Sequence, residues 1–252
     1  MRAIRIAGIG MVVAGVLSIA GAGPAAARAG AGGCPLPRFG PGRDYHPHID
    51  AARFSSLVDN AWFPLRVGTT WLYAGRRDGQ AVVDVVKATR HTRMIDGVRT
   101  RVVADRLFAG GRLAERTSDY FAQDACGNVW YFGEDTAELD EHGRVTSRDG
   151  TWHAGVDGAE PGVVMQAHPQ LDRRFRQEWY AGSAEDTFSV RDRTARVTVP
   201  AGTYTHALRT AEHSRLEPNV IDNKYYVRGI GEVQEIAVHG PQERLGLVEV
   251  LR

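Results

Sequence analysis

Acidic side chains on both sides of a predicted turn are the first candidates for chemistry in this chain. In the segment QEWYAGSAED, a four-residue hairpin loop after Tyr180 would place Tyr180 opposite Glu185. Glu178 would then be a diagonal neighbour of Glu185, within about 5–8 Å on the same face of the sheet. Two carboxyl groups at that separation serve as a general acid and base, as a nucleophile and acid, or as ligands of a hard cation. The pattern therefore predicts Glu178, Glu185 and Asp186 as candidate catalytic residues.

The prediction depends on the hairpin register, because a shift of one residue moves every side chain to the opposite face. In the predicted register, Trp179 and Asp186 share the face opposite to Glu178. The alternative is that the face of Glu178 points to water. Its carboxylates are then solvated and Trp179 belongs to the core.

Two histidines and an aspartate alternate in the segment HPHID, as His46, His48 and Asp50. Their side chains would project together from an extended backbone. Imidazole and carboxylate groups bind transition metals, so the three residues are candidate metal ligands. The alternative is that they are ordinary surface residues, because the segment is proline-rich and has no obvious further ligand. The sequence indicates no particular cofactor.

Aromatic residues form a third group of candidates, for ligand binding. Trp130 and Tyr131 are adjacent on a predicted strand, so they point to opposite faces and cannot both line one cavity. Trp152 follows in a predicted loop region, and Trp179 and Tyr180 belong to the acidic segment. An inward-facing ring of this group could bind an apolar ligand, a sugar or a lipid. Packing in the core is the alternative.

Several common functional signatures are absent from the sequence. It contains no Gly-x-Ser-x-Gly, no His-Glu-x-x-His, no Walker loop and no complete dinucleotide fingerprint. Its 31 basic and 30 acidic residues give a formal charge of +1. That balance offers no electrostatic basis for binding nucleic acid.

The N-terminus indicates export. Residues 1–29 combine Arg2 and Arg5, an apolar run over residues 6–20 and Ala-x-Ala cleavage patterns, which is typical of a signal peptide. The run is too short and too rich in glycine for the ~20 apolar residues of a membrane anchor. We expect a linker over residues 30–47 and one β-rich domain over residues 48–252. The mature chain, without a membrane span, would be secreted or held in the cell envelope.

The two cysteines fit that location. Cys34 and Cys126 are an even pair in a chain predicted to reach an oxidising compartment, which favours a disulfide. Lipidation of Cys34 is the alternative, because small residues precede it.

Turn dipeptides divide most of the remaining chain into strands. Asp78-Gly79, Asp96-Gly97 and Gly110-Gly111 separate runs rich in β-branched and aromatic residues, as in an antiparallel meander. Further strands are predicted over residues 129–132, 175–180, 186–190, 195–199, 204–212, 224–227, 232–238 and 245–251.

So many strands must curl, split or close to cover their edges. We predict an all-β fold in which the meander forms a barrel or half-barrel, with one or two short helices; the alternative is a two-sheet sandwich. A helix is expected over residues 50–58, with Asp50 as its N-cap and an apolar stripe of Phe54, Leu57 and Val58. Residues 134–170 are rich in Gly, Asp and Pro and predict long loops.

The chain also resembles a group of uncharacterised exported bacterial proteins of β-rich fold. The resemblance rests on NAWFPL followed by GTTWLY, on GNVWYFGE, on the QEWYAGSAED segment and on VPAGTY. It implies an exported β-rich fold and no particular catalytic residue.

These observations lead to three functional hypotheses. The first is an exported protein that binds a small apolar or amphipathic ligand inside a barrel. The second is a secreted hydrolase or lyase that uses the paired carboxylates, with or without a metal. The third is an envelope protein whose loops contact another protein. The sequence does not set the oligomeric state.

Overall fold

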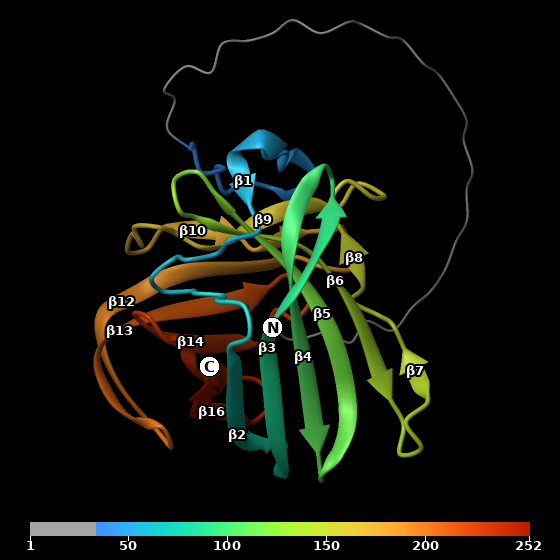
Figure 1. Cartoon of the computed structure of the whole chain (residues 1–252), viewed down its shortest axis with the longest axis vertical. Coiled ribbons are helices and arrows are strands. Elements are labelled where there is room, and N and C mark those ends of the chain that lie inside the picture. The colour runs from blue at the N-terminus through green and yellow to red at the C-terminus, as the bar shows by residue number, and fades with distance from the viewer. Residues whose placement is uncertain (1–33) are drawn as a thin grey trace, which may run out of the picture.

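The computed structural model describes residues 34–252, and the predicted signal peptide lies outside this range. The described chain forms an antiparallel sheet that curls until it is nearly closed into a barrel (Figure 1). The main path through the sheet is β10-β12-β13-β14-β15-β16-β2-β3-β4-β5-β6-β9-β11, with β1, β7 and β8 as side branches. The predicted all-β barrel is therefore confirmed. No helix in the described range is long and apolar enough to cross a membrane.

The elements have the following bounds, in chain order: η1 (Gly42–Asp44), η2 (Ala51–Arg53), β1 (Phe54–Ser55), β2 (Thr70–Arg77), β3 (Gln80–Ile95), β4 (Val98–Ala109), β5 (Arg112–Asp124), β6 (Val129–Leu139), β7 (Val145–Ser147), β8 (Trp152–His153), β9 (Glu160–Met165), β10 (Arg174–Arg176), β11 (Glu178–Trp179), β12 (Asp186–Val199), β13 (Gly202–Ser214), β14 (Ile221–Val227), β15 (Gly231–His239) and β16 (Glu243–Leu251).

The first wall of the barrel is the predicted meander, strands β2 to β6. Its tight turns carry positive φ at both central residues, 48° and 80° at Asp78-Gly79 and 47° and 74° at Asp96-Gly97. Hairpin turns whose twist matches the flanking strands require this conformation, which Asp and Gly tolerate. The turn residues therefore set the strand boundaries that the sequence predicted.

The second wall consists of β12 to β16, and the last strand closes it against the first wall. Strand β16 pairs with β2, with Leu251 opposite Thr70 and Glu243 opposite Arg77. The two strands predicted over residues 186–190 and 195–199 are one strand, β12, whose pairing with β13 is shifted at irregular positions. Bulges of this kind let a long strand bend around a barrel.

A short double segment closes the remaining gap between the walls. Strand β10 pairs with β12, placing Arg176 opposite Thr187, whereas β11 pairs with β9, placing Glu178 opposite Pro161. Between them, the backbone N–H of Gln177 donates to the carbonyl of Asp186 at 2.8 Å. We call residues 174–179 the seam, because the chain changes strand partner there.

Two expectations about local structure were wrong. The helix predicted over residues 50–58 is one 3-10 turn, η2, which Asp50 caps by accepting from the N–H of Ala52, and Phe54 then enters strand β1. Leu57 of the expected apolar stripe is 63% exposed, so no helical face is buried there. The region over residues 134–170 is not only loops, since it contains the end of β6 and strands β7, β8 and β9.

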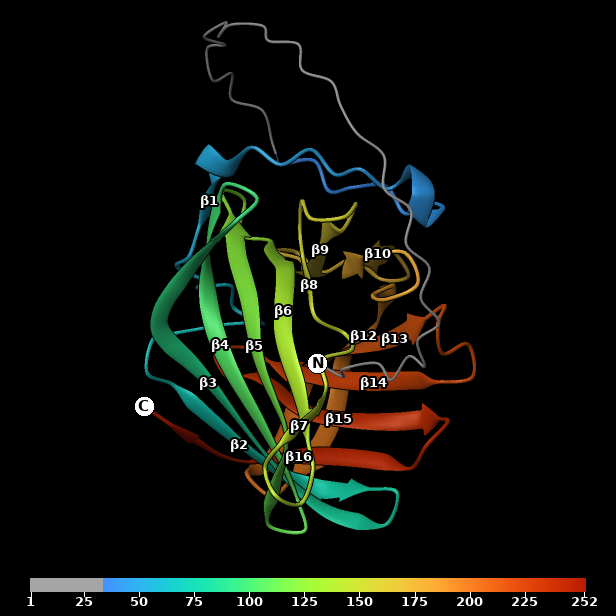
Figure 2. The same ribbon diagram turned by 90° about the vertical axis from the view of Figure 1, so that its right-hand side faces the viewer.

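The segment over residues 34–53, which we call the arm, lies across one end of the barrel (Figure 2). The predicted disulfide between Cys34 and Cys126 anchors its start, with the two Cα atoms 5.8 Å apart. Further along, the Tyr45 hydroxyl donates to the carbonyl of Pro161, and Arg176 donates to the carbonyl of Gly40. The arm is thus attached both to the turn after β5 and to the seam.

Candidate functional site

The inner face of the barrel carries many carboxyl groups. On the first wall, Asp84 lies opposite Tyr73, and Asp105 lies opposite Val86. Asp119 on β5 is in turn opposite Glu134 on β6. Residues directly opposite each other in an antiparallel pair share one face of the sheet, so these groups form a ladder across the interior.

The second wall adds more carboxyl groups and a lysine. Glu212 lies opposite Asp222, Lys224 lies opposite Glu235, and Tyr226 lies opposite Glu232. Lys224 is 3% exposed and its ammonium lies 3.3 Å from a Glu212 oxygen, 3.9 Å from Glu235 and 4.0 Å from Glu232. Burial alone would lower the pKa of Lys224, but these three glutamates hold that pKa well above its ordinary value.

Two adjoining cavities lie between these side chains. The carboxylate cavity has a volume of about 30 Å³, and the aromatic cavity has a volume of about 90 Å³. Gln177, Lys224 and Glu235 line both, so the two cavities are neighbours that share these side chains. The carboxylate cavity is lined by Glu134, Glu178, Asp186, Glu212, Glu217, Asp222 and Glu235. The aromatic cavity combines the rings of Phe63, Trp71, Tyr73, Phe121 and Tyr226 with Asp84, Asp105, Asp119, Glu232 and Glu235.

Burial raises the pKa of several of these carboxyl groups. It raises the pKa of Asp186 and of Glu232 to about 7 and that of Asp119 to about 6. Glu178 has a pKa well above its ordinary value, first because of burial and then because of the neighbouring Asp186. The pKa of Glu134 is also well above its ordinary value, first because of burial and then because of the neighbouring Asp119. The interior therefore retains protons that exposed carboxyl groups would release.

The predicted acidic pair is arranged differently from the expectation. Tyr180 pairs with Ala184 rather than with Glu185, so the predicted register was wrong by one residue. As a result Glu178 and Asp186 both line the carboxylate cavity. Glu185 instead accepts from Arg215 at 2.5 and 2.6 Å and from the N–H of Gly182 at 2.8 Å. Although burial opposes it, these donors hold the pKa of Glu185 below its ordinary value.

The adjacent aromatic residues lie on opposite faces, as predicted. Tyr131 points inward, donates to Asp119 at 2.8 Å and stacks on Phe121 with ring centres 4.9 Å apart. Trp130 points the other way, where its indole donates to Asp124 at 3.1 Å and its ring meets Phe54. Of this pair, the structure therefore brings Tyr131 to the cavities.

The other predicted rings occupy separate places. Trp152 is buried behind Tyr131, with ring centres 5.3 Å apart in an edge-to-face contact. Trp179 lies at the seam, where the Arg176 guanidinium carbon is 4.6 Å from the centre of the Trp179 ring. Tyr180, the next residue, is half-buried. Neither Trp179 nor Tyr180 lines the two cavities.

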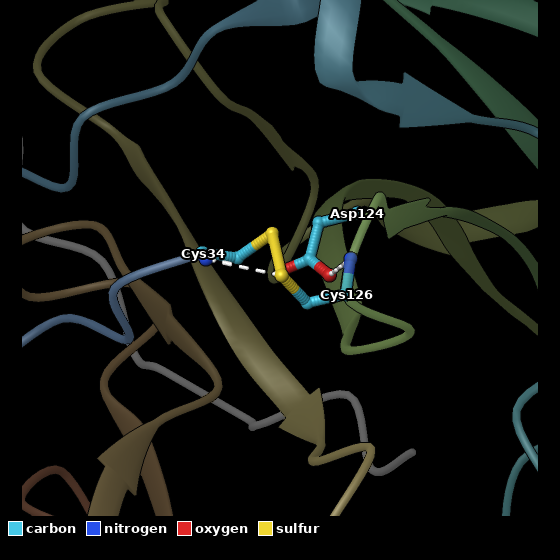
Figure 3. A group of neighbouring side chains, drawn as sticks. All are labelled: Cys34, Asp124 and Cys126. Atoms are coloured by element: carbon cyan, nitrogen blue, oxygen red, sulfur yellow. Dashed lines mark hydrogen bonds between the residues drawn. A yellow bond between two sulfur atoms is a disulfide. The ribbon is translucent and has the colours of Figure 1, made fainter. Parts of the chain in front are cut away.

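The candidate metal ligands do not converge. His46 lies 2.8 Å from a Glu160 oxygen, and Asp50 is occupied in capping η2. Across residues 34–252, one group of at least three acidic, histidine or cysteine side chains has ligand atoms within 4.8 Å of one another. That group is Cys34, Asp124 and Cys126, whose two sulfur atoms are joined in the disulfide (Figure 3).

Asp124 has a structural role beside the disulfide. Its carboxylate accepts from the backbone N–H groups of Cys126 and Asn128, from the Asn128 amide and from the Trp130 indole, all within 2.8–3.1 Å. It thereby fixes the turn that carries Cys126 (Figure 3).

Sequence reasoning missed most of the groups that line the cavities. Asp84 lies between two valines, and Asp222 and Lys224 alternate along β14. Such alternation separates the two faces of a strand but does not say which face is inside. The usual assignment of charged residues to water points them outward, whereas here they face the interior. The spacing of acidic residues on successive strands was the available signal.

Comparisons with known proteins give a fold likeness only. No model of a known protein family matches this chain, and no curated protein matches it in sequence. Among solved structures, the chain is similar to a candidate exported protein with a YmcC-like fold from Bacteroides fragilis, with 14% identity and a TM-score of 0.43. It is also similar to a candidate lipoprotein from Parabacteroides distasonis, with 12% identity and a TM-score of 0.40. Both alignments cover 77% of this chain and 100% of the other.

Proposed function

We propose that this chain is an exported binding protein that holds a small amphipathic ligand inside the barrel. The observation that carries the proposal is the pair of adjoining cavities. One offers five aromatic rings to an apolar group, and the other offers carboxyl groups to a polar one. Ligand sites typically combine an apolar lining with a few polar groups that fix orientation.

The size of the cavities limits the ligand. A cavity of about 150 Å³ admits benzene, so the aromatic cavity of about 90 Å³ fits a group of a few carbon atoms. Binding of a long acyl chain or a ring system is disfavoured. The ligand is therefore small, with its apolar part near Trp71 and Phe121.

Export is supported by two features. The sequence over residues 1–29 has the pattern of a signal peptide, and the Cys34–Cys126 disulfide suits an oxidising compartment. The protein would meet its ligand outside the cytoplasm.

Filling the aromatic cavity tests the proposal. Val86 lines that cavity on β3, whereas Val83 on the opposite face of the same strand is 38% exposed. Wild-type protein is screened by native mass spectrometry and thermal shift against short-chain alcohols, acids, amines and small sugars. We expect Val86→Phe to abolish binding of the ligand found, and Val83→Phe to retain it. The milder Val86→Leu, which should weaken binding, covers the case in which Val86→Phe does not fold. Binding unchanged by cavity filling would contradict the proposal.

A second candidate function, a hydrolase or lyase, is favoured by one observation. Glu178 and Asp186 line the same cavity and both have raised pKa values, as proton-transferring pairs in enzymes often do. The same screen separates the two functions. Compounds that are recovered unchanged support binding, whereas a new product mass supports catalysis.

A further inference from the structure

The charges around the two cavities are strongly unbalanced. Seven carboxyl groups line the carboxylate cavity and five line the aromatic cavity, with Glu235 common to both. Among the lining residues, Lys224 is the one lysine or arginine, and its ammonium already lies beside Glu212. Burying carboxylates without nearby cations is costly. An additional positive group would therefore find compensation here, and a negative one would be repelled.

Buried polar atoms without a hydrogen-bond partner also favour a positively charged ligand. Gln177 is 5% exposed and lines both cavities, yet its side-chain oxygen has no hydrogen-bond donor. A buried oxygen of Asp84 in the aromatic cavity and one of Asp186 in the carboxylate cavity also have no donor. Buried polar atoms are nearly always hydrogen-bonded in folded proteins. The Gln177 atom is an acceptor, and the two aspartate oxygens are acceptors when their carboxyl groups are ionised, so a ligand that supplies donors and positive charge, such as an ammonium group, would satisfy all three.

The spacing of these groups does not suit a compact metal ion. A divalent cation requires several ligand oxygens within a few ångströms of one another. In the described chain, no three of these carboxyl groups come within 4.8 Å of one another. The unpartnered oxygens of Asp84 and Asp186 lie in different, neighbouring cavities, which share Gln177 and Lys224 as lining residues. A cation that reaches both must be elongated.

We propose that the ligand is a short linear aliphatic diamine that extends from one cavity into the other. One ammonium group would lie near Asp84 and Asp105, the methylene chain would contact the aromatic rings, and another ammonium would lie near Glu178 and Asp186. Lys224 shows how such a ligand would be held, since its own alkyl chain is buried and its ammonium lies beside a carboxylate. This inference rests on the proposed binding function and names its ligand class.

Proton release would accompany binding. The pKa of Asp186 is raised to about 7, mainly by burial, so an arriving ammonium group displaces a proton from part of the population near neutrality. Affinity should therefore increase as the pH rises from 6 to 8. The other charged and titratable groups that line the same cavity are Tyr131, Glu134, Glu178, Glu212, His213, Glu217, Asp222, Lys224 and Glu235.

Calorimetry on the purified protein at pH 8 tests the inference. The probe is 1,4-diaminobutane, with 1,4-butanediol as the neutral match, n-butylamine as the single-ammonium match and calcium chloride as the divalent match. We expect saturable binding of the diamine, weaker binding of n-butylamine, and none of the diol. Comparing buffers with different ionisation enthalpies should reveal proton release.

Neutral isosteric variants test the two ends of the site. Glu178→Gln with Asp186→Asn should weaken diamine binding by at least about tenfold, as should Asp84→Asn with Asp105→Asn, because each pair replaces carboxyl groups that can ionise beside an ammonium group with amides that stay neutral. Asp149→Asn in an exposed turn is the matched control and should bind like wild type. The thermal transition of each variant verifies folding. These substitutions keep side-chain shape while removing buried charge, so they should not lower stability at pH 8.

The possible results separate this inference from the function on which it rests. Equal binding of the diol, binding of calcium alone, or variants that bind diamine like wild type would overturn the diamine assignment. If amines fail but a neutral or acidic compound binds wild type and not Val86→Phe, the binding function stands and the ligand class falls. If no compound of either panel binds, both fall.

Discussion

Lys224 is the residue on which the charge balance of the barrel interior depends. Its side chain is 4% exposed, and its ammonium is shared by Glu212, Glu232 and Glu235 from three positions on the second wall. Removing one partner of a buried ion cluster leaves the others uncompensated, which is strongly destabilising. The sequence contains one further lysine, Lys87, which is exposed on β3.

Lys224→Met keeps the length of the side chain and deletes its charge. We expect this variant to lose about 3–5 kcal/mol of unfolding free energy at pH 8. The loss should be smaller at pH 5.5, because Glu232, whose pKa burial raises to about 7, is then protonated and no longer needs the ammonium. Urea unfolding at the two pH values measures both effects.

Lys87→Met is the matched control and should unfold like wild type at either pH. A Lys224→Met variant as stable as wild type at pH 8 would contradict the role of this ammonium in balancing the buried charge.

At the scale of single residues, sequence reasoning found some members of the site and misplaced others. Glu178 and Asp186 were identified by their types, and both line the carboxylate cavity. Local sequence predicts a four-residue loop that places Glu185 near Glu178, whereas in the structure the loop is one residue shorter and Ala184 pairs with Tyr180. Loop length and register depend on tertiary contacts of the seam, which local sequence does not contain.

The arm is the element whose attachment has the clearest steric requirement. Gly42 begins η1 and is buried against Trp179 of the seam. A methyl group at this position would lie 1.9 Å from two carbon atoms of the indole ring. Gly40, two residues earlier, has no atom within 4 Å of the corresponding position. The backbone therefore requires glycine at position 42, where it approaches the Trp179 ring, but not at position 40.

Gly42→Ala should loosen the arm from the seam. We expect the free energy of unfolding to fall by about 1–3 kcal/mol, the usual cost of forcing an extra group into a packed contact. Limited proteolysis with the disulfide intact should cut the arm faster in this variant, and mass spectrometry locates the cuts.

Gly40→Ala serves as the control and should be cut at the wild-type rate. Equal protection of both variants would mean that the Trp179 ring moves aside without cost.

At the scale of elements, the predicted strands were the most reliable part of the sequence analysis. The Asp-Gly and Gly-Gly turns of the first wall occur where residues with positive φ are required, so their positions are set by local chemistry. The 3-10 turn at η2 was predicted as a helix because Asp50 is a good cap, but Phe54 gains more by packing on Trp130 and Phe132 from strand β1. This packing energy comes from residues far away in the sequence, so the local sequence does not predict it.

The molecule as a whole should be most stable on the acidic side of neutrality. Burial raises the pKa of Glu115, Asp186 and Glu232 to about 7 and that of Asp119 to about 6, all above the values of the unfolded chain. The folded protein therefore binds more protons than the unfolded chain between about pH 4.5 and 7, and stability falls as the pH rises through that range.

Other groups oppose this trend only in part. The pKa values of Asp135 and Glu185 are lowered, and their contribution is lost only as the pH falls below the ordinary carboxyl range. Burial lowers the pKa of His213, so this residue favours the folded state less as the pH falls through about 6.5. Four raised carboxyl groups outweigh one histidine near neutrality.

We therefore predict a higher melting temperature at pH 5.5 than at pH 8. A net difference of one pKa unit corresponds to about 1.4 kcal/mol, or about 3–5 °C for a protein of this size. Calorimetric melting across pH 4–9 at constant ionic strength measures the profile, and Asp186→Asn should flatten it. A melting temperature that rises steadily from pH 5.5 to 8 would contradict the assignment of protonated carboxyl groups in the interior.

At the scale of the whole molecule, sequence reasoning predicted a barrel but not its polar interior. Strand number and the need to cover sheet edges lead to closure. The content of the barrel depends on which face of each strand turns inward, and this follows from the direction in which the complete sheet curls. Trp71 and Tyr73 point inward as an apolar pattern predicts, whereas Asp84 and Asp105 point inward against it.

The placement of the two lysines also makes the chain its own reporter of barrel opening. An acylating reagent can reach the ε-amine of Lys87 while the barrel is closed, because that residue is exposed. The amine of Lys224 is enclosed within the wall and reacts only when the strands around it separate. The rate at which Lys224 itself is acylated, located by peptide mass spectrometry, therefore measures how often the barrel interior opens to solvent.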